Sequence, residues 1–203
     1  MRVRDSGMPD EGLWEQLLDV DLILDRLGIG AGLTNVAELG CGYGTFTIPV
    51  ADRISGTLHA YDIDESMVAR ARERASRAGL ANVVVERRDV LADGFGLPDR
   101  SQDGCLLLNI LHHEDPVVIL TAAAEILRPA GRLFIIHWRH DANTPRGPDL
   151  SIRPRPDQIV AWAAQACSLR LHGDVQDLPP WHYGLVLTNA NDVAPGSGRQ
   201  RGG

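Results

Sequence analysis

Short apolar segments of strand length alternate along the chain with segments of helical periodicity. The apolar segments predict strands at residues 35–39, 57–63, 82–87, 104–109 and 132–137, and weaker strands near 168–173 and 182–188. Helical spacing of apolar residues predicts helices over 12–27, 45–54, 66–78, 116–128 and 156–166. Such alternation is typical of a doubly wound α/β fold, in which helices cover both faces of a mainly parallel sheet. Ligands of these sheets bind beyond the carboxyl ends of the strands.

The chain has the length of one domain. A chain of 203 residues buries roughly 70% of its unfolded surface when it folds. We expect a single domain over residues 1–189. Residues 190–203 are rich in Gly, Pro, Ser and Asn, which predicts a disordered tail.

Charge and composition exclude several functions. The net charge of −7 argues against a nucleic-acid surface, which needs a basic face to meet phosphates. All 20 residues counted as Lys plus Arg are arginine. Without lysine, the chain cannot form the Schiff base of pyridoxal phosphate or aldolase chemistry. A Walker phosphate loop also requires lysine and is excluded as well.

The spacing of the cysteines and the distribution of apolar residues indicate the cellular compartment. Cys41, Cys105 and Cys167 form no CxxC pair, which argues against a zinc knuckle, a redox motif and a disulfide scaffold. The opening segment MRVRDSGMPDEG lacks the apolar stretch of a signal peptide. No run of 18 apolar residues predicts a membrane span. We therefore expect a cytoplasmic protein that contacts neither nucleic acid nor membrane.

A glycine-rich loop, VAELGCGYGTF at residues 36–46, joins the first predicted strand to a helix. Gly40, Gly42 and Gly44 permit positive φ and leave room for a ligand against the main chain. The spacing ExGxGxG differs from the dinucleotide fingerprint GxGxxG, because the third glycine of that fingerprint is missing. Glu38 precedes the first glycine by two residues, where a carboxylate would repel a pyrophosphate but suit a cationic ligand.

Two polar residues are predicted to cap the helices that follow the first two strands. Thr45 would cap the first helix, which puts Pro49 in the first turn, where its missing N–H is tolerated. Asp64 would cap the second helix and leave Asp62 available at the end of the second strand. A carboxylate there, 22 residues after Gly40, can accept ribose hydroxyls.

Together with this loop, four further segments resemble the motif series of the Rossmann-like S-adenosylmethionine (SAM) methyltransferases. They are TLHAYDID at 57–64, NVVVERRDV at 82–90, DGCLLLNILHHEDP at 103–116 and ILRPAGRLFIIHW at 126–138. The last is similar to the family's Leu-Lys-Pro-Gly-Gly turn, with Arg128 and Ala130 as departures. The resemblance is good over roughly residues 30–140 and poor at both ends. It implies seven strands, the last antiparallel.

The resemblance implies SAM as cofactor and S-adenosylhomocysteine as product. It implies a cofactor site of Glu38, Gly40, Cys41, Gly42, Gly44, Asp62, Ile63, Asp89, Val90 and Asn109. Asp62 would bind the ribose, and Ile63 would lie on the adenine face. Asp89 would accept from the adenine amino group, with Val90 beside the ring. It also implies that residues 1–30 form a helical lid region.

The chemistry of transfer makes few demands on side chains. The methyl group of SAM is already activated, so the protein mainly aligns the acceptor and excludes water. A base is needed only for an acceptor that still carries its proton.

Two adjacent histidines follow the fourth predicted strand. Our candidate catalytic base is His113, and His112 is a candidate acceptor contact. Alternatively, one of these histidines packs in a loop and the other faces solvent. Adjacent ligands do not converge without a rigid scaffold, so we expect no metal.

The segment after Asn109 narrows the acceptor class. Ile-Leu-His-His stands where enzymes that methylate adenine or glutamine amino groups have Pro-Pro-Tyr or Pro-Pro-Phe, and it resembles the small-molecule methyltransferases of quinone and secondary metabolism. Trp14, Trp138 and Arg139 are further candidate acceptor contacts. Trp14 can alternatively be a core anchor of its helix.

A proline-rich segment at residues 141–156 is a candidate substrate loop. Its arginines Arg146, Arg153 and Arg155 could meet an acidic acceptor, although a solvated loop is the simpler interpretation.

Two other functions stay open at this point. A SAM-binding sensor or partner subunit without turnover would carry the same cofactor residues. A nicotinamide oxidoreductase is disfavoured by the missing third glycine.

Overall fold

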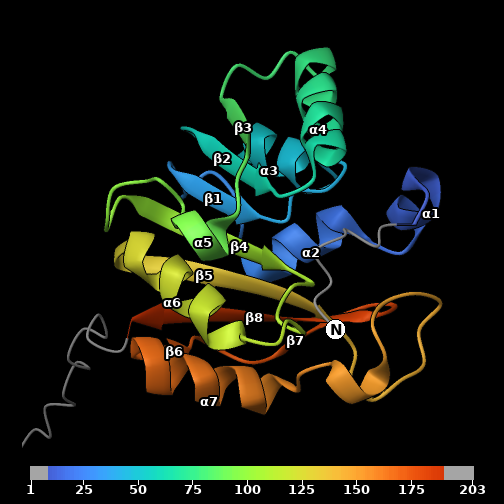
Figure 1. Cartoon of the computed structure of the whole chain (residues 1–203), viewed down its shortest axis with the longest axis vertical. Coiled ribbons are helices and arrows are strands. Elements are labelled where there is room, and N and C mark those ends of the chain that lie inside the picture. The colour runs from blue at the N-terminus through green and yellow to red at the C-terminus, as the bar shows by residue number, and fades with distance from the viewer. Residues whose placement is uncertain (1–8, 190–203) are drawn as a thin grey trace, which may run out of the picture.

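The computed structural model describes residues 9–189. Its strands are β1 (Val36–Leu39), β2 (Leu58–Asp62), β3 (Val83–Arg87), β4 (Gln102–Leu108), β5 (Leu127–Trp138), β6 (Leu169–Leu171), β7 (Gln176–Leu178) and β8 (His182–Asn189). Its helices are α1 (Glu11–Gln16), α2 (Val20–Leu27), α3 (Thr47–Arg53), α4 (Glu65–Arg77), α5 (Val90–Asp93), α6 (Pro116–Ile126), α7 (Pro156–Cys167) and the 3-10 helix η1 (Leu150–Ile152). Strands and helices alternate from β1 to β5, with α3, α4 and α6 near their predicted positions (Figure 1). The predicted tail at 190–203 lies outside the described residues.

The strands form one sheet in the order β3-β2-β1-β4-β5-β8-β6, and β7 pairs with β8. β1 to β5 pair in parallel, whereas β8 is antiparallel to β5 and sets His182 opposite Trp138. β8 therefore begins at the edge where the parallel strands end. The predicted doubly wound, mainly parallel sheet is confirmed. The short β7 adds an eighth strand that the periodicity did not predict.

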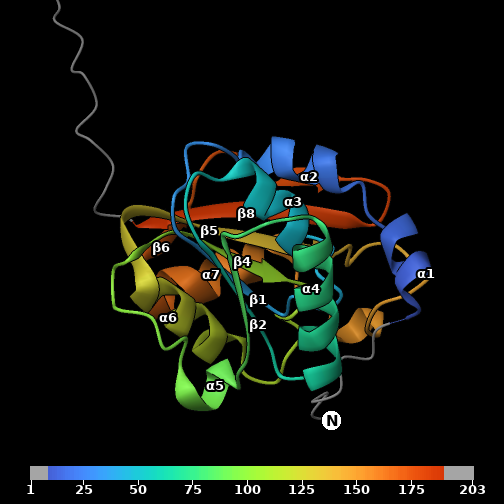
Figure 2. The same cartoon turned by 90° about the horizontal axis from the view of Figure 1, so that it is seen from above.

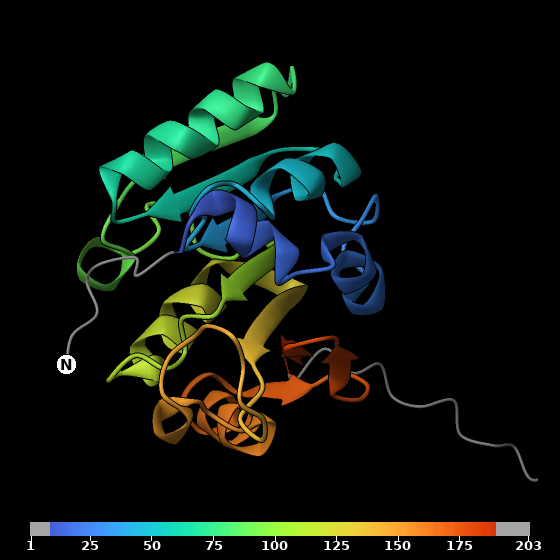
Figure 3. The same cartoon turned by 90° about the vertical axis from the view of Figure 1, so that its right-hand side faces the viewer.

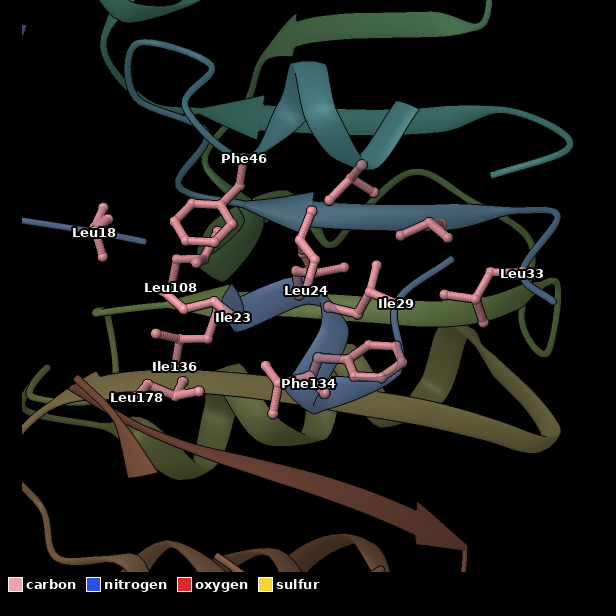
Figure 4. Close-up of a cluster of buried hydrophobic side chains, with 14 of the residues drawn as sticks. Leu18, Ile23, Leu24, Ile29, Leu33, Phe46, Leu108, Phe134, Ile136 and Leu178 are labelled. Atoms are coloured by element: carbon pink, nitrogen blue, oxygen red, sulfur yellow. The ribbon is translucent and has the colours of Figure 1, made fainter. Parts of the chain in front are cut away.

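Helices cover both faces of the sheet (Figure 2). Helices α2, α3 and α4 lie on one face, and α5, α6 and α7 lie on the other. The central strand β4 serves both layers: Leu106 and Leu108 pack in the cluster that contains Leu24 of α2, whereas Cys105 and Leu107 pack with α6 and α7. Figure 4 shows the first cluster around α2. A strand buried on both faces reads as a continuous apolar run, which is why β4 was predicted correctly.

The N-terminal helix predicted over residues 12–27 is two helices. The first ends at Gln16, and Asp19 caps α2, because its side chain accepts from the backbone N–H of Leu22 at 3.1 Å. Such local bonding by aspartate competes with helix continuation. α2 buries Ile23, Leu24 and Leu27, whereas α1 buries no residue. In the part of the chain that the structure describes, no helix is long and apolar enough to cross a membrane.

The two predicted caps have different outcomes. Asp64 caps α4 by accepting from the backbone N–H of Ser66 at 2.8 Å, as predicted. The prediction for Thr45 was wrong, since α3 starts at Thr47 after Phe46 and has no side-chain cap. The Thr45 side chain is buried rather than folded back onto the helix amides, and its Oγ1 has no hydrogen-bond partner among the described residues.

Several helices and strands begin or end at residues other than those predicted. The helix predicted to reach residue 128 ends at Ile126, because the chain from Leu127 onward already pairs with β4. The fourth strand ends at Leu108, one residue before its predicted end, since Asn109 has a φ of +52° and begins a loop. The short α5 and η1 lie in segments predicted as loops.

Asp103 anchors the amino end of the sheet, opposite the ligand edge. It is 3% exposed, and its Oδ2 accepts from the backbone N–H groups of Thr34 at 2.9 Å and Asn35 at 2.7 Å. Its other oxygen pairs with Arg128. This carboxylate joins the segment before β1 to β4.

We expect Asp103→Ala to lower the free energy of unfolding by about 2–4 kcal/mol, because it leaves two backbone N–H groups without their acceptor. Urea denaturation followed by circular dichroism measures this loss. Arg128→Ala is the control and should cost less than Asp103→Ala, since the Arg128 side chain is 53% exposed and Asp103 keeps both backbone donors in that variant. Equal losses in the two variants would contradict the role given to Asp103.

Candidate functional site

The candidate site is the edge where β1, β2, β4 and β5 end and β8 begins. The loops that follow these strands gather with α1 at one side of the molecule, on the right in Figure 1 and facing the viewer in Figure 3. Two contacts between distant segments define this edge. The hydroxyl of Tyr43 donates to the carbonyl of Pro9 at 2.8 Å, and Asn109 Nδ2 lies 3.3 Å from His182 Nε2.

The glycine loop presents bare backbone. Gly40, Gly42 and Gly44 have φ values of +81°, +52° and +80°. A Cβ on Gly40 would lie 3.3 Å from the side chain of Ile110, and one on Gly44 would lie 3.4 Å from Ala71 of α4. The loop is therefore held between α4 and the loop after β4, in a conformation that glycine adopts without strain.

Glu38 of β1 is a buried carboxyl, 1% exposed. Thr47 Oγ1 donates to its Oε2 at 2.6 Å, while its Oε1 has no hydrogen-bond partner among the described residues. Burial raises the pKa of Glu38 to about 8, against the opposing hydrogen bond from Thr47, and the charge of Asp62 adds to the rise. Buried polar atoms in folded proteins nearly always have a hydrogen-bond partner, so the unpaired oxygen indicates a missing ligand. A cationic group of that ligand would hold this carboxyl ionised.

Asp62 links the glycine loop to the loop after β2. Its Oδ2 accepts from the backbone N–H of Gly42 at 2.9 Å, and its Oδ1 accepts from that of Asp64 at 3.0 Å. Burial raises the pKa of Asp62, although these hydrogen bonds oppose the rise. Each carboxylate oxygen has two lone pairs, so each keeps a position for a hydroxyl donor.

The other predicted cofactor residues differ in their surroundings. Ile63, directly after β2, is 36% exposed. Asp89 caps α5 through the N–H of Ala92 at 3.3 Å. Val90 and Cys41 are buried in separate apolar clusters, and burial raises the pKa of the Cys41 thiol. Ile63 and Asp89 thus present side chains near the edge, whereas Val90 and Cys41 belong to the core.

Histidines gather where β4 and β5 end and β8 begins. The ring centres of His112 and His137 are 5.6 Å apart, and those of His137 and His140 lie 6.1 and 6.2 Å from that of Tyr183. Burial lowers the pKa of His112, and it lowers the pKa values of His137 and His182 to about 3. These three imidazoles are neutral at pH 7.

Buried polar atoms without partners concentrate around these histidines. Among the described residues, five such atoms lie here: Asn109 Oδ1, His112 Nδ1, His137 Nε2, His140 Nδ1 and His182 Nδ1. Such groups are rare in folded proteins and require an explanation. A bound polar ligand would provide their partners.

His112 and His113, the two histidines predicted at the site, have different roles in the loop. His113 Nδ1 accepts from the backbone N–H of Asp115 at 3.1 Å, which shapes the turn before α6. His112 is half-buried and lies edge-on to His137. Sequence reasoning missed His182, although a polar residue at the start of an antiparallel last strand must lie at this edge.

The predicted acceptor contacts occupy three environments. Trp14 is half-buried and lies edge-on to Trp138, with ring centres 6.0 Å apart. Trp138 is 2% exposed and packs on His182 at 4.2 Å between ring centres. Arg139 is paired with Asp141 at 3.1 Å and with Asp177 at 3.0 Å. The guanidinium of Arg139 therefore already has carboxylate partners.

Ion pairs hold α1 across the edge. Glu11 pairs with Arg70 at 2.8 Å and with Arg74 at 3.0 Å, and Glu15 pairs with Arg74 at 2.7 Å. Both arginines belong to α4, so α1 spans from α4 to Trp138 of β5.

A groove of about 560 Å³ lies beside this arrangement, between α1, α2 and α3. Its lining includes Glu15 and Arg74, and it touches the glycine loop at Thr45. Glu38, Asp62 and the histidines are not part of it, so the groove borders the candidate site. Within residues 9–189, no group of three or more His, Cys, Asp or Glu side chains is arranged to hold a metal ion.

Glu38 makes the stability of the ligand-free protein depend on pH. The folded state holds a proton on this carboxyl between the ordinary pKa of 4.5 and the folded value of about 8. The stabilisation is therefore complete below pH 4.5 and is lost as the pH rises through 8, by at most about 1.4 kcal/mol per pH unit. We expect Glu38→Gln to flatten the fall of stability from pH 5 to pH 8. Urea denaturation across this range measures it, and equal slopes in both proteins would contradict the assignment.

Residues 36–131 match the family described as "Methyltransferase domain". A 37.1 kDa uncharacterized protein in transposon TN4556 of Streptomyces fradiae is 34% identical over 74% of this chain and 46% of its own length. Aklanonic acid methyltransferase DauC of Streptomyces sp. strain C5 is 33% identical over 54% of this chain and 57% of its own. The chain spans about half the length of these relatives. A 23S rRNA methyltransferase of Xylella fastidiosa also matches, with 43% identity over 37% of this chain.

Solved structures share the fold. A SAM-dependent methyltransferase from Aquifex aeolicus superposes with a TM-score of 0.75 at 23% identity, over 88% of this chain and 93% of that one. The [4+2]-cyclase SpnF superposes with a TM-score of 0.69 at 17% identity, over 91% and 85%. The glycine loop, the doubly wound sheet and the family match agree: residues 36–131 carry a methyltransferase domain, on a fold shared with SAM-dependent methyltransferases.

Proposed function

We propose that this protein transfers the methyl group of SAM to a small-molecule acceptor. When bound, SAM would supply a methyl group activated by its positively charged sulfur. The observation that carries the proposal is Glu38, a buried carboxyl with an unpaired oxygen at the glycine loop. A cationic cofactor would hold this carboxyl in its ionised form and pair with it, whereas a pyrophosphate would be repelled by the ionised form.

The other proposed cofactor contacts lie at the same edge of the sheet. Asp62 would bind the two ribose hydroxyls with the acceptor positions that its backbone hydrogen bonds leave free. Ile63 offers an exposed apolar side chain to one face of the adenine. Asp89 would accept from the adenine amino group. The bare backbone at Gly40, Cys41, Gly42 and Gly44 and the residues Val90 and Asn109 would complete the binding site.

The chain's part in the transfer is to align the acceptor and to exclude water. Residues 1–8 of the predicted lid region 1–30 lie outside the described residues, and the described part, which includes α1, would act as a lid over the edge. For an acceptor that must lose a proton, the geometry favours His112 over the sequence-predicted His113 as base. His112 is a neutral imidazole whose Nδ1 has no partner among the described residues, whereas His113 Nδ1 is engaged by the backbone.

Several features favour a small-molecule acceptor. DauC is named for aklanonic acid, and a relative from Amycolatopsis mediterranei is named a 27-O-demethylrifamycin SV methyltransferase. Other relatives are named as RNA methyltransferases. The net charge of −7 disfavours RNA as the acceptor here. The free thiols of Cys41, Cys105 and Cys167 are consistent with a reducing compartment.

Binding of SAM without turnover is the alternative function. Release of S-adenosylhomocysteine during incubation with extracts of small metabolites distinguishes an enzyme from a sensor or a partner subunit.

Thermal unfolding with SAM, S-adenosylhomocysteine and NADH in parallel tests the cofactor. A ligand at 100-fold its Kd adds about 2.7 kcal/mol of stability, which raises the Tm of a chain of this size by roughly 5–10 °C. We expect this rise with both adenosyl compounds and none with NADH. A rise with NADH alone would favour the oxidoreductase instead.

We expect Asp62→Asn to weaken S-adenosylhomocysteine binding by about 10- to 100-fold, because an amide replaces a charged acceptor at the ribose. Titration calorimetry measures the Kd. The matched control is Asp64→Ala, which removes the cap of α4 at a cost of about 1 kcal/mol in stability and should leave the Kd unchanged. Unaltered affinity in Asp62→Asn would refute the ribose assignment.

A further inference from the structure

The loop between β5 and α7 buries an arginine at the candidate site. Arg153 is 8% exposed. Its Nε donates to the carbonyl of Pro148 at 2.8 Å, and its Nη1 donates to the carbonyls of Arg139 at 2.9 Å and Ala142 at 3.4 Å. Its guanidinium carbon lies 5.8 Å from the ring centre of Trp138. The loop thus wraps the arginine at the end of β5.

Arg153 differs from Arg139 and Arg155 because, among the described residues, it has no carboxylate within ion-pair distance. Arg139 pairs with two aspartates, and Arg155 pairs with Asp157 at 2.8 Å. Over residues 9–189, no carboxylate lies within 4.0 Å of Arg153, and its Nη2 makes no hydrogen bond. Asp149 is the acid that acts on it at longer range, but this carboxylate is exposed and accepts from Ser151 instead.

A buried guanidinium without a counter-charge is costly. Burial lowers the pKa of Arg153, yet an arginine side chain keeps its proton in proteins. The three carbonyls satisfy part of its hydrogen-bonding capacity but supply no negative charge. A charge of this kind destabilises the fold unless a partner compensates it.

The neighbouring side chains do not supply that partner. Burial lowers the pKa values of His112, His137 and His182, and the positive charge of Arg153 contributes to each. Arg153 is therefore within electrostatic reach of all three imidazoles. These rings are neutral, and each has an unpaired nitrogen. The cluster combines one positive charge with neutral polar groups, which suits a ligand with a single negative charge.

We propose that the acceptor carries an ionised carboxylate and that Arg153 Nη2 binds it, with the neutral histidines around it as further polar contacts. Since Nε and Nη1 donate to backbone carbonyls, Nη2 is the nitrogen left to form a charge-assisted hydrogen bond with a carboxylate oxygen. One buried guanidinium with a single free nitrogen is a weaker match for a doubly charged phosphate than for a carboxylate. The ligand's role as a methyl acceptor rests on the proposed function. Binding of its carboxylate by Arg153 does not depend on methyl transfer.

The test compares benzoate with its neutral analogue benzamide as probes of the full chain. Titration calorimetry, with and without S-adenosylhomocysteine, measures both affinities. We expect benzoate to bind at least about tenfold more tightly than benzamide, and the ratio to fall to about one in Arg153→Gln. The matched control is Arg155→Gln, which removes an exposed arginine of the same loop and should leave the ratio unchanged.

Equal affinities of the wild-type protein for the two probes would overturn the proposal, as would a preference that survives Arg153→Gln. If that variant does not fold, Arg153→Lys is the second test, since lysine keeps the charge but cannot donate to the three backbone carbonyls and also hold a donor at the position of Nη2. It should bind benzoate about fivefold more weakly, with benzamide unchanged. An unchanged benzoate affinity would refute the proposal.

Binding of S-adenosylhomocysteine to the same samples separates the two hypotheses. A protein that binds S-adenosylhomocysteine but does not prefer benzoate would refute the carboxylate inference alone. A protein that prefers benzoate through Arg153 but does not bind S-adenosylhomocysteine would refute the proposed methyl transfer alone.

Discussion

The parallel pairing of β1 with β2 and β4 is the constraint on which the whole candidate site depends. Leu39 lies opposite both Tyr61 and Leu107, so the chain leaves all three strands at the same level. Asp62 and Asn109 therefore share an edge with the glycine loop, although they belong to separate strand–helix units. These strands are buried on both faces, and a shift of one residue would exchange every side chain between the two cores. The packing of the core thus holds the polar groups in place.

This edge has acidic groups at one end and a cation at the other. Glu38 and Asp62 are buried carboxyls near the glycine loop, and burial raises both pKa values. Arg153 is a buried cation near β5 and β8, among imidazoles that burial keeps neutral. Each group costs free energy while it lacks a partner. A cationic cofactor at one end and an anionic acceptor at the other would give these buried groups partners and remove both free-energy costs. The unpaired groups are therefore what a site for two ligands of opposite charge requires.

Helix α1 connects the two ends and is held differently from the rest of the fold. It buries no residue, and its attachments are ion pairs from Glu11 and Glu15 and the edge-on contact of Trp14. These pairs are partly buried but remain in contact with solvent, which screens them and limits their contribution to stability. An element with few buried apolar contacts can open without unfolding the domain. A lid over a site that must exclude water needs this property.

The sequence by itself determined the alternation of strands and helices, the glycine loop and the cap at Asp64, because these features arise from spacing within a few residues. It also placed Asp62 and Asn109 at strand ends. Only the tertiary structure decided that Thr45 caps nothing, that β5 begins at Leu127, and that His182 and Arg153 join the site. The physical reason is that burial and hydrogen-bond partners come from contacts between residues distant along the chain, which override local preference. Arg153 looked like a solvated loop residue until the fold enclosed it.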